Sequence, residues 1–195
     1  CNPLILHTHS IEEILKFVQH IPPAALKLAK AFWPGPLTLL LPKKSNIPLS
    51  VTSGSHLVAV RIPNHAVTLS LLEQLDFPLV APSANPYTRI SPTNAKMVDD
   101  YFGEALPVIL DGDICAKGIE STIVGFHDNI PVIYRQGAIS VDAIEFIAGK
   151  SKVQATIKEK VTTPGMSPMH YAPITKFCIV ESILDFIYEN RDLKI

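Results

Sequence analysis

The stretch LVAVRIPNHAVTLSLLEQLDFPLVAPSAN, residues 57–85, predicts a strand, a helix and a second strand in succession. An apolar run over 57–62 stops at Pro63, apolar residues at helical spacing cover 66–75, and a second apolar run covers 77–81. This alternation is typical of α/β domains, in which helices pack against a central sheet. The stretch therefore favours an α/β fold.

The sequence on either side continues the pattern and predicts a mixed sheet. Ser10 is expected to cap a helix, with Glu13 at the capping-box position. Asn94 and Ser140 are expected to cap two later helices. The remaining predicted elements are strands over 4–7, 37–41, 107–110, 121–126 and 131–134, and helices over 24–32, 94–101 and 141–147. The two strands over 121–126 and 131–134 are expected to pair with each other.

Composition excludes several classes of protein. The chain has 195 residues, of which 47% are hydrophobic, and a net charge of -1, so disorder and binding by bulk charge are both disfavoured. Its three cysteines, Cys1, Cys115 and Cys178, form no CxxC pair, which predicts a reduced cytoplasmic protein without structural zinc. The apolar runs are too short to span a membrane.

The sequence predicts three segments. Residues 1–149 form the α/β domain, the polar and proline-containing residues 150–173 form a linker, and residues 174–195 begin a second α/β domain. The first strand follows almost directly on Cys1, so we expect an upstream segment that this sequence lacks.

Polar side chains lie at the ends of several apolar strands, where α/β sheets bind ligands. These are His7, Arg61, the group from Ser83 to Ser91, and Ser121. Each serine also fits a turn or a helix cap, and His7 also fits a histidine with purely structural contacts. Arg61 alternates with apolar neighbours in its strand, so a partly buried guanidinium there requires a carboxylate or a phosphate.

Several motifs occur together in one order: NPLILH, WPGPLT, VAVRIPNH, LVAPSAN followed by SPT, GIESTIV, YRQGAI and PGMSPMHYAP. In this, the chain resembles the threonylcarbamoyl-adenylate synthases, the YrdC-like family, in the longer form with a linker and a C-terminal domain. The resemblance covers about residues 1–175. It implies a twisted mixed sheet with flanking helices.

The resemblance also implies an activity. L-threonine, bicarbonate and ATP would combine into threonylcarbamoyl-AMP with release of pyrophosphate. A threonylcarbamoyl transferase complex would then modify the adenosine beside the anticodon of tRNAs that read ANN codons. The enzyme would be a nucleotidyltransferase with possible contact to tRNA.

The same resemblance assigns roles to residues in matching motifs. Ser83 and Asn85 match the catalytic SxN signature beside the nucleotide phosphates. The residues matching the ATP site are Asn2, Leu57, Ser83, Asn85, Ser91, Arg135 and Tyr171. The residues matching the L-threonine site are His7, Arg61, Ala81 and Ser121.

Three departures from the family pattern affect these expectations. The KxR signature that should lie just before Asn2 is absent, so this chain by itself is expected to have impaired activity. Leu57 replaces a usual threonine, which leaves only its backbone for an ATP contact, and Arg89 lies where a small residue is usual. No cluster of His, Cys or carboxylates has metal-ligand spacing, so Mg²⁺ is expected to arrive bound to the ATP phosphates.

Two other functions fit parts of the sequence. A domain of this shape can bind double-stranded RNA or tRNA without catalysis, although the neutral overall charge disfavours it. A carbamoyl-adenylate enzyme of the hydrogenase-maturation kind is the other alternative. Such enzymes usually carry zinc-finger cysteines, and this sequence has none in that spacing.

Overall fold

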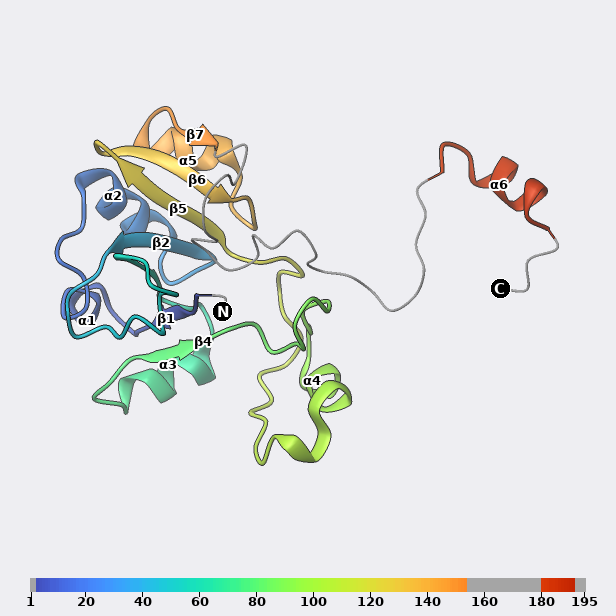
Figure 1. The fold of residues 1–195 in the computed structure, drawn as a ribbon, viewed down its shortest axis with the longest axis horizontal. Helices are drawn as coiled ribbons and strands as arrows, with labels where there is room; N and C mark the ends of the chain where they lie inside the picture. Colours follow the sequence, from blue (N-terminus) through green and yellow to red (C-terminus); the bar gives the residue numbers. More distant parts are fainter. Residues whose placement is uncertain (1–2, 154–179, 192–195) are drawn as a thin grey trace.

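The computed structural model describes residues 3–153 and 180–191, and a mixed sheet forms the centre of the fold (Figure 1). Within these residues the sheet has seven strands in the order β4-β1-β3-β2-β5-β6-β7. Their bounds are β1 Ile5–His7, β2 Leu37–Pro42, β3 Leu57–Arg61, β4 Leu79–Ala81, β5 Thr122–His127, β6 Ile130–Arg135 and β7 Lys152–Val153. The predicted mixed α/β fold is confirmed.

The helices begin largely where the sequence predicts. Ser10, Asn94 and Ser140 each accept a hydrogen bond from the backbone N–H three residues later, as expected of N-caps. The helices are α1 Ile11–Ile14, α2 Pro23–Phe32, α3 Ala66–Glu73, α4 Ala95–Phe102, η1 Gly103–Ala105 (a 3-10 turn), α5 Val141–Ala148 and α6 Ile183–Glu189.

Strand pairing is both parallel and antiparallel. β1 pairs in parallel with β3, β2 with β5, and β6 with β7. The pairs β1–β4, β2–β3 and β5–β6 are antiparallel. The ends of β1, β3 and β6 therefore lie at the same edge of the sheet as the starts of β2 and β5.

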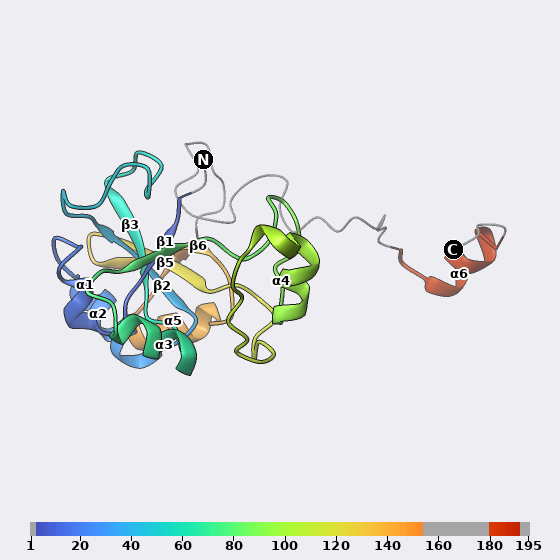
Figure 2. The same cartoon turned by 90° about the horizontal axis from the view of Figure 1, so that it is seen from below.

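One face of the sheet is packed against helices. In Figure 2, α1, α2, α3 and α5 lie on this side of the sheet, whereas α4 lies to one side of it. Because side chains alternate along a strand, every second residue enters this core. The buried cluster includes Leu6, Leu39, Val58, Val60, Val124 and Ile133 from the sheet and Ile14, Leu28 and Ile144 from the helices.

The other face carries a much smaller apolar cluster, which consists of Ile5, Leu40 and Ala59 with Leu57 and Tyr134 packed against it. We call it the open face, because the four helices lie on the other side of the sheet (Figure 2). His7 and Arg61 lie on this face too, since each is two residues along its strand from a member of the cluster.

One predicted strand is wrong. Residues 107–110 form no strand, and Val108 and Leu110 are 71% and 62% exposed. The run has the composition of a strand, but within the described residues no strand lies beside it to accept its backbone hydrogen bonds.

The C-terminal part of the chain is described only in pieces. β7 lies inside the stretch predicted as a linker and extends the sheet to Val153. The rest of the linker and residues 174–179 lie outside the described residues, and α6 falls within the predicted second domain. The three-segment division stays a prediction.

Candidate functional site

Residues from five strands or their flanking loops meet at one edge of the open face. His7 and Arg61 are direct partners in the β1–β3 register. The start of β2 lies next, with Leu37 paired to Thr122, and Ile123 of β5 is paired to Arg135 of β6. Ser121, which immediately precedes β5, therefore lies at the same edge as Arg61 and His7.

Arg61 has hydrogen-bonding capacity at this edge that no described residue uses. Its Nε donates to the Gly35 carbonyl oxygen at 3.0 Å. Within the described residues its terminal amino groups have no hydrogen-bond partner, and no carboxylate lies within ion-pairing distance. Burial lowers the pKa of Arg61, and the negative charge of Glu120 opposes that shift. A partly buried guanidinium with two unused amino groups is suited to bind an anion.

His7 is held in its neutral form. Burial, followed by the positive charge of Arg61, lowers the pKa of His7 to about 4. A neutral imidazole has one nitrogen that donates and one that accepts. Hydrogen bonds to the backbone of Ile5 and Leu79 oppose this shift, so the ring is also held by its own chain. Neutral His7 can therefore lie beside a ligand on Arg61 without adding a second positive charge.

Ser121 is fixed from two sides. Its hydroxyl lies 2.8 Å from that of Thr38, and both residues are almost fully buried. Arg135 donates to the Ser121 carbonyl oxygen through Nε at 3.0 Å and through a terminal nitrogen at 2.8 Å, and to the Ser121 hydroxyl at 2.9 Å. These contacts leave the hydroxyl little rotational freedom.

The loop that follows β4 is ordered by Asn85. Its side-chain amide donates to the backbone oxygens of Pro86 and Arg89, both at 3.0 Å. The Ser91 hydroxyl lies 3.3 Å from the side-chain oxygen Oδ1 of Asn85 and donates to a carboxylate oxygen of Glu120 at 2.6 Å. The loop thus turns back from β4 and ends against the residue that precedes Ser121.

The structure brings most, but not all, of the predicted site residues together. Ala81 shares the face of His7 and Arg61 but is paired with Ile5, so it lies about 7 Å along the sheet from that edge. Leu57 is four residues from Arg61, about 13 Å along β3, and its backbone N–H already donates to the Ser55 hydroxyl.

For three other predicted site residues, no contact of the described structure supports the assigned role. Ser83 is exposed, and its hydroxyl makes no hydrogen bond within the described residues. Asn2 and Tyr171 lie outside the described residues, so their assigned roles stay predictions.

Glu120 and Thr38 are the site residues that sequence reasoning missed. An acidic residue in a glycine-containing loop is usually interpreted as a solvent-exposed charge, and a threonine inside an apolar run is usually interpreted as part of the core. One signal was available. Glu120 directly precedes Ser121, at the point where the loop before β5 leads into a buried strand.

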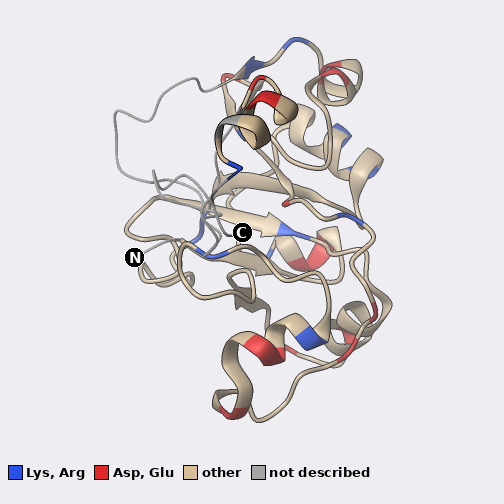
Figure 3. Ribbon diagram, turned by 90° about the vertical axis from the view of Figure 1, so that its right-hand side faces the viewer, with Lys and Arg blue, Asp and Glu red and all other residues tan. Residues whose placement is uncertain are grey.

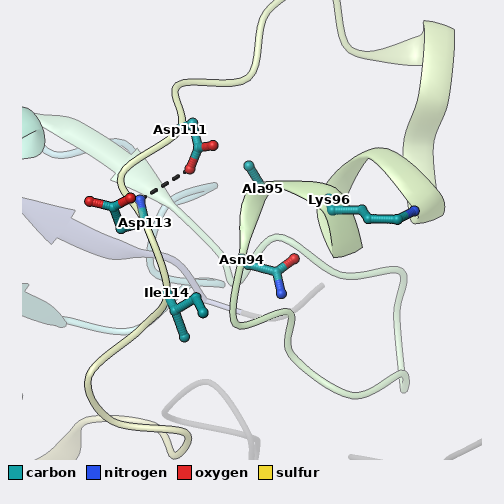
Figure 4. A pocket seen from close by; sticks show the side chains of 6 residues that line it. All are labelled: Asn94, Ala95, Lys96, Asp111, Asp113 and Ile114. Carbon is teal, nitrogen blue, oxygen red and sulfur yellow. Dashed lines mark hydrogen bonds between the residues drawn. The ribbon is translucent and has the colours of Figure 1, made fainter.

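Two cavities lie away from this edge. The first, of about 440 Å³, lies between the start of α4 and the loop from Asp111 to Ile114, and Figure 4 shows that none of the predicted site residues lines it. The second, of about 340 Å³, lies at the opposite end of β2 and β3, and Leu57 is among its lining residues. Cavity size alone therefore does not identify the site.

Three general features of the described residues bear on function: the distribution of charge, the absence of a metal-ligand cluster and the absence of a membrane-spanning helix. In Figure 3 the Lys and Arg positions and the Asp and Glu positions are spread over many elements. Among the residues that the structure describes, no group of three or more His, Cys, Asp or Glu side chains could hold a metal ion. None of the helices in this part of the chain has the length and apolar character of a membrane span.

Comparison with known protein sequences gives consistent results. A family model described as "Telomere recombination" (Sua5_yciO_yrdC) matches residues 1–137. The threonylcarbamoyl-AMP synthase of Pyrococcus abyssi is 39% identical over 189 residues, covering 94% of this chain and 55% of that protein. The enzyme of the same name from Schizosaccharomyces pombe is 39% identical over 209 residues, covering 90% of this chain and 51% of that protein. The chain spans about half the length of these curated relatives.

Comparison with solved structures shows that related proteins share this fold. The crystal structure of P. abyssi Sua5 complexed with L-threonine has a TM-score of 0.84 at 39% identity, covering 88% of this chain and 52% of that chain. E. coli YciO has a TM-score of 0.64 at 19% identity, covering 73% of this chain and 69% of that chain. At that identity the second likeness concerns the fold alone.

Proposed function

Since this chain belongs to the Sua5/YciO/YrdC family, we propose that it is the synthase part of a threonylcarbamoyl-AMP synthase. The reaction joins L-threonine, bicarbonate and ATP into threonylcarbamoyl-AMP and releases pyrophosphate, which makes the protein a nucleotidyltransferase. Two relatives at 39% identity carry that enzyme name, and a related Sua5 structure contains L-threonine.

The observation that carries the proposal is the Arg61 guanidinium at the edge of the open face. Its two terminal amino groups have the geometry to bind a carboxylate with two parallel hydrogen bonds. Neutral His7 lies beside it, and Ser121 lies at the same edge. In the proposed site Arg61 binds the threonine carboxylate, while His7, Ser121 and the Ala81 carbonyl bind its amino and hydroxyl groups.

ATP is proposed to lie along the loop that follows β4, residues 82–91, which we call the polar loop, and along the adjacent edge. Ser83 and Asn85 are placed beside the phosphates, with Ser91 and Arg135 as further contacts. Support comes from the loop itself, which Asn85 closes and which ends on Ser91 near Arg135. The residues proposed to complete this ATP site are Asn2 and Tyr171, whereas the backbone N–H of Leu57 is already bound to the Ser55 hydroxyl.

The proposed chemistry needs positioning more than a nucleophilic side chain. The threonine amine first attacks the carbon of bicarbonate, and water leaves to give a carbamate. A carbamate oxygen then attacks the α-phosphorus of ATP as the bond to pyrophosphate breaks. Arg61 orients the threonine, and the polar loop orients the phosphates, so that the reacting atoms lie in line. Mg²⁺, held through the ATP phosphates, would neutralise charge on the leaving pyrophosphate.

The biological setting is part of the proposal. The product would be passed, in the cytoplasm, to a threonylcarbamoyl transferase complex that modifies the adenosine next to the anticodon of tRNAs reading ANN codons.

The experiment that tests the proposal has two parts. L-threonine is titrated calorimetrically into the chain, with L-valine, a near isostere without the hydroxyl, as the matched control. Pyrophosphate release from ATP is then measured with and without L-threonine and bicarbonate. Saturable binding of threonine but not valine, and pyrophosphate release that needs threonine, are expected. Salt-dependent binding of double-stranded RNA with neither of these results would instead identify an RNA-binding module.

A further inference from the structure

Glu120 occupies the junction between the two halves of the proposed site. One carboxylate oxygen accepts a hydrogen bond from Ser91 at 2.6 Å, and the other lies 3.8 Å from a terminal nitrogen of Arg135. The next residue, Ser121, is the one that Arg135 binds through both backbone and side chain. Glu120 therefore joins the polar loop to the edge where Arg61 lies.

The backbone of Glu120 is itself tightly fixed. Its carbonyl oxygen accepts a hydrogen bond from the Ala138 N–H at 3.0 Å. A Cβ at Gly137 would overlap that same carbonyl oxygen, so the segment after β6 packs directly on the backbone before β5. With its backbone held in place, the side chain of Glu120 serves as a rigid arm that reaches the loop at Ser91.

A carboxylate in this position needs an explanation. The proposed ligands are a threonine carboxylate and a triphosphate, and a nearby negative charge repels both. Glu120 is thus poorly suited to bind phosphate directly. It is well suited to hold protein groups, because it neutralises part of the charge of Arg61 and Arg135 and accepts a short, charge-assisted hydrogen bond from Ser91.

We propose that Glu120 is a positioning residue that holds the polar loop, through Ser91, in register with Arg135 and Ser121. The inference rests on the proposed function, since it assigns Glu120 the task of keeping the ATP side and the threonine side of that site in one geometry. For this role the length of the Glu120 side chain, which allows the contact with Ser91, is more important than its charge.

A set of matched variants separates reach from charge. Glu120→Gln keeps the length and an oxygen acceptor but loses the charge, whereas Glu120→Asp keeps the charge and is one methylene too short. Ser91→Ala removes the donor, and Glu120→Ala removes the whole contact. Each variant of the chain, and the Ser91→Ala/Glu120→Ala double variant, is titrated with ATP and with L-threonine. Hydrogen exchange of residues 84–93 is followed in parallel without ligand.

We expect Glu120→Ala and Glu120→Asp to weaken ATP binding roughly tenfold, and Ser91→Ala to weaken it at least as much, because Ser91 is also a proposed ATP contact. The double variant is expected to be no weaker than Ser91→Ala alone, because Ser91→Ala already removes the contact that Glu120→Ala removes. Exchange of the loop should accelerate in all of these variants. Glu120→Gln should retain most of the ATP affinity and of the loop protection.

Additive losses in the double variant, or rescue by Glu120→Asp and not by Glu120→Gln, would overturn the positioning role. Unchanged loop exchange in Glu120→Ala would also overturn it, whatever the chain binds. If the unsubstituted chain binds neither L-threonine nor ATP, the proposed function fails, and loop exchange alone decides the role of Glu120.

Discussion

The two faces of the central sheet are built by the same strands but carry different kinds of side chain. In β3, Val58 and Val60 are buried under helices, whereas Ala59 and Arg61 lie on the open face. Thr38 and Leu39 divide in the same way in β2, since Thr38 binds Ser121 and Leu39 belongs to the core. Neighbouring residues thus serve packing and, in the proposed site, ligand binding separately.

This division makes the two kinds of substitution distinguishable. A change on the helix-packed face should lower the free energy of unfolding, while a change at the edge of the open face should alter ligand binding with little loss of stability. Each prediction below tests one side of that difference.

The largest expected effect is on the helix-packed face. Leu39→Ala removes a fully buried side chain and should lower the free energy of unfolding by about 2–5 kcal/mol. The matched control is Leu57→Ala on the open face, which removes a half-buried side chain and should cost about 1 kcal/mol. Urea denaturation measures both. Equal losses would show that the two faces are equally packed.

His7, on the open face, makes the free energy of unfolding depend on pH. The unfolded chain takes up a proton at His7 near pH 6.5, whereas the folded chain keeps the imidazole neutral down to about pH 4. The stability associated with neutral His7 is therefore complete above pH 6.5 and decreases as pH falls from 6.5 to about 4. The total is at most about 3 kcal/mol.

The difference in unfolding free energy between the parent chain and His7→Asn isolates the effect of His7 from that of the other titratable groups. Urea denaturation is carried out at several pH values between 4 and 8. The parent should lose stability relative to His7→Asn as the pH falls through this range. A constant difference would mean that His7 is not held neutral in the folded protein.

Arg61→Gln should weaken L-threonine binding by about 2 kcal/mol, because it removes charged hydrogen bonds to the carboxylate. Its free energy of unfolding should fall by only about 1 kcal/mol, because the variant loses the Nε hydrogen bond to the Gly35 oxygen. Within the described residues the terminal amino groups of Arg61 hold no partner. Lys96→Gln, at an exposed cation of α4, is the control and should bind threonine as the parent does. Calorimetry supplies the affinities.

The smallest expected effects are in the polar loop. Ser83→Ala should weaken ATP binding by about 1 kcal/mol, the value of one neutral hydrogen bond, and leave stability unchanged because Ser83 is exposed. Asn85→Ala should have a somewhat larger effect, because it also removes the two hydrogen bonds that close the loop. ATP titrations that show no loss in either variant would assign the loop a purely structural role.

Local signals in the sequence predicted most of the fold. The caps Ser10, Asn94 and Ser140 were readable because a side-chain acceptor before an apolar helix acts within three residues. Residues 107–110 were misread, because strand composition does not reveal whether a neighbouring strand exists. Strand pairing depends on residues far away in the chain.

The site was predictable only in part, for the same reason. Arg61 stood out because a charge within an alternating apolar strand demands a partner. Glu120 did not, because its importance arises from contacts with Ser91 and Arg135, which are 29 and 15 residues distant in the sequence. Such contacts become visible only when the strands are assembled.

The most direct test of a threonine site on the open face is a crystal structure of the chain grown with saturating L-threonine. We expect the threonine carboxylate to bind the terminal amino groups of Arg61, with Ser121 and His7 within hydrogen-bonding distance of the ligand. Threonine bound on another surface, or an Arg61 that still binds only Gly35 at saturating ligand, would contradict this assignment.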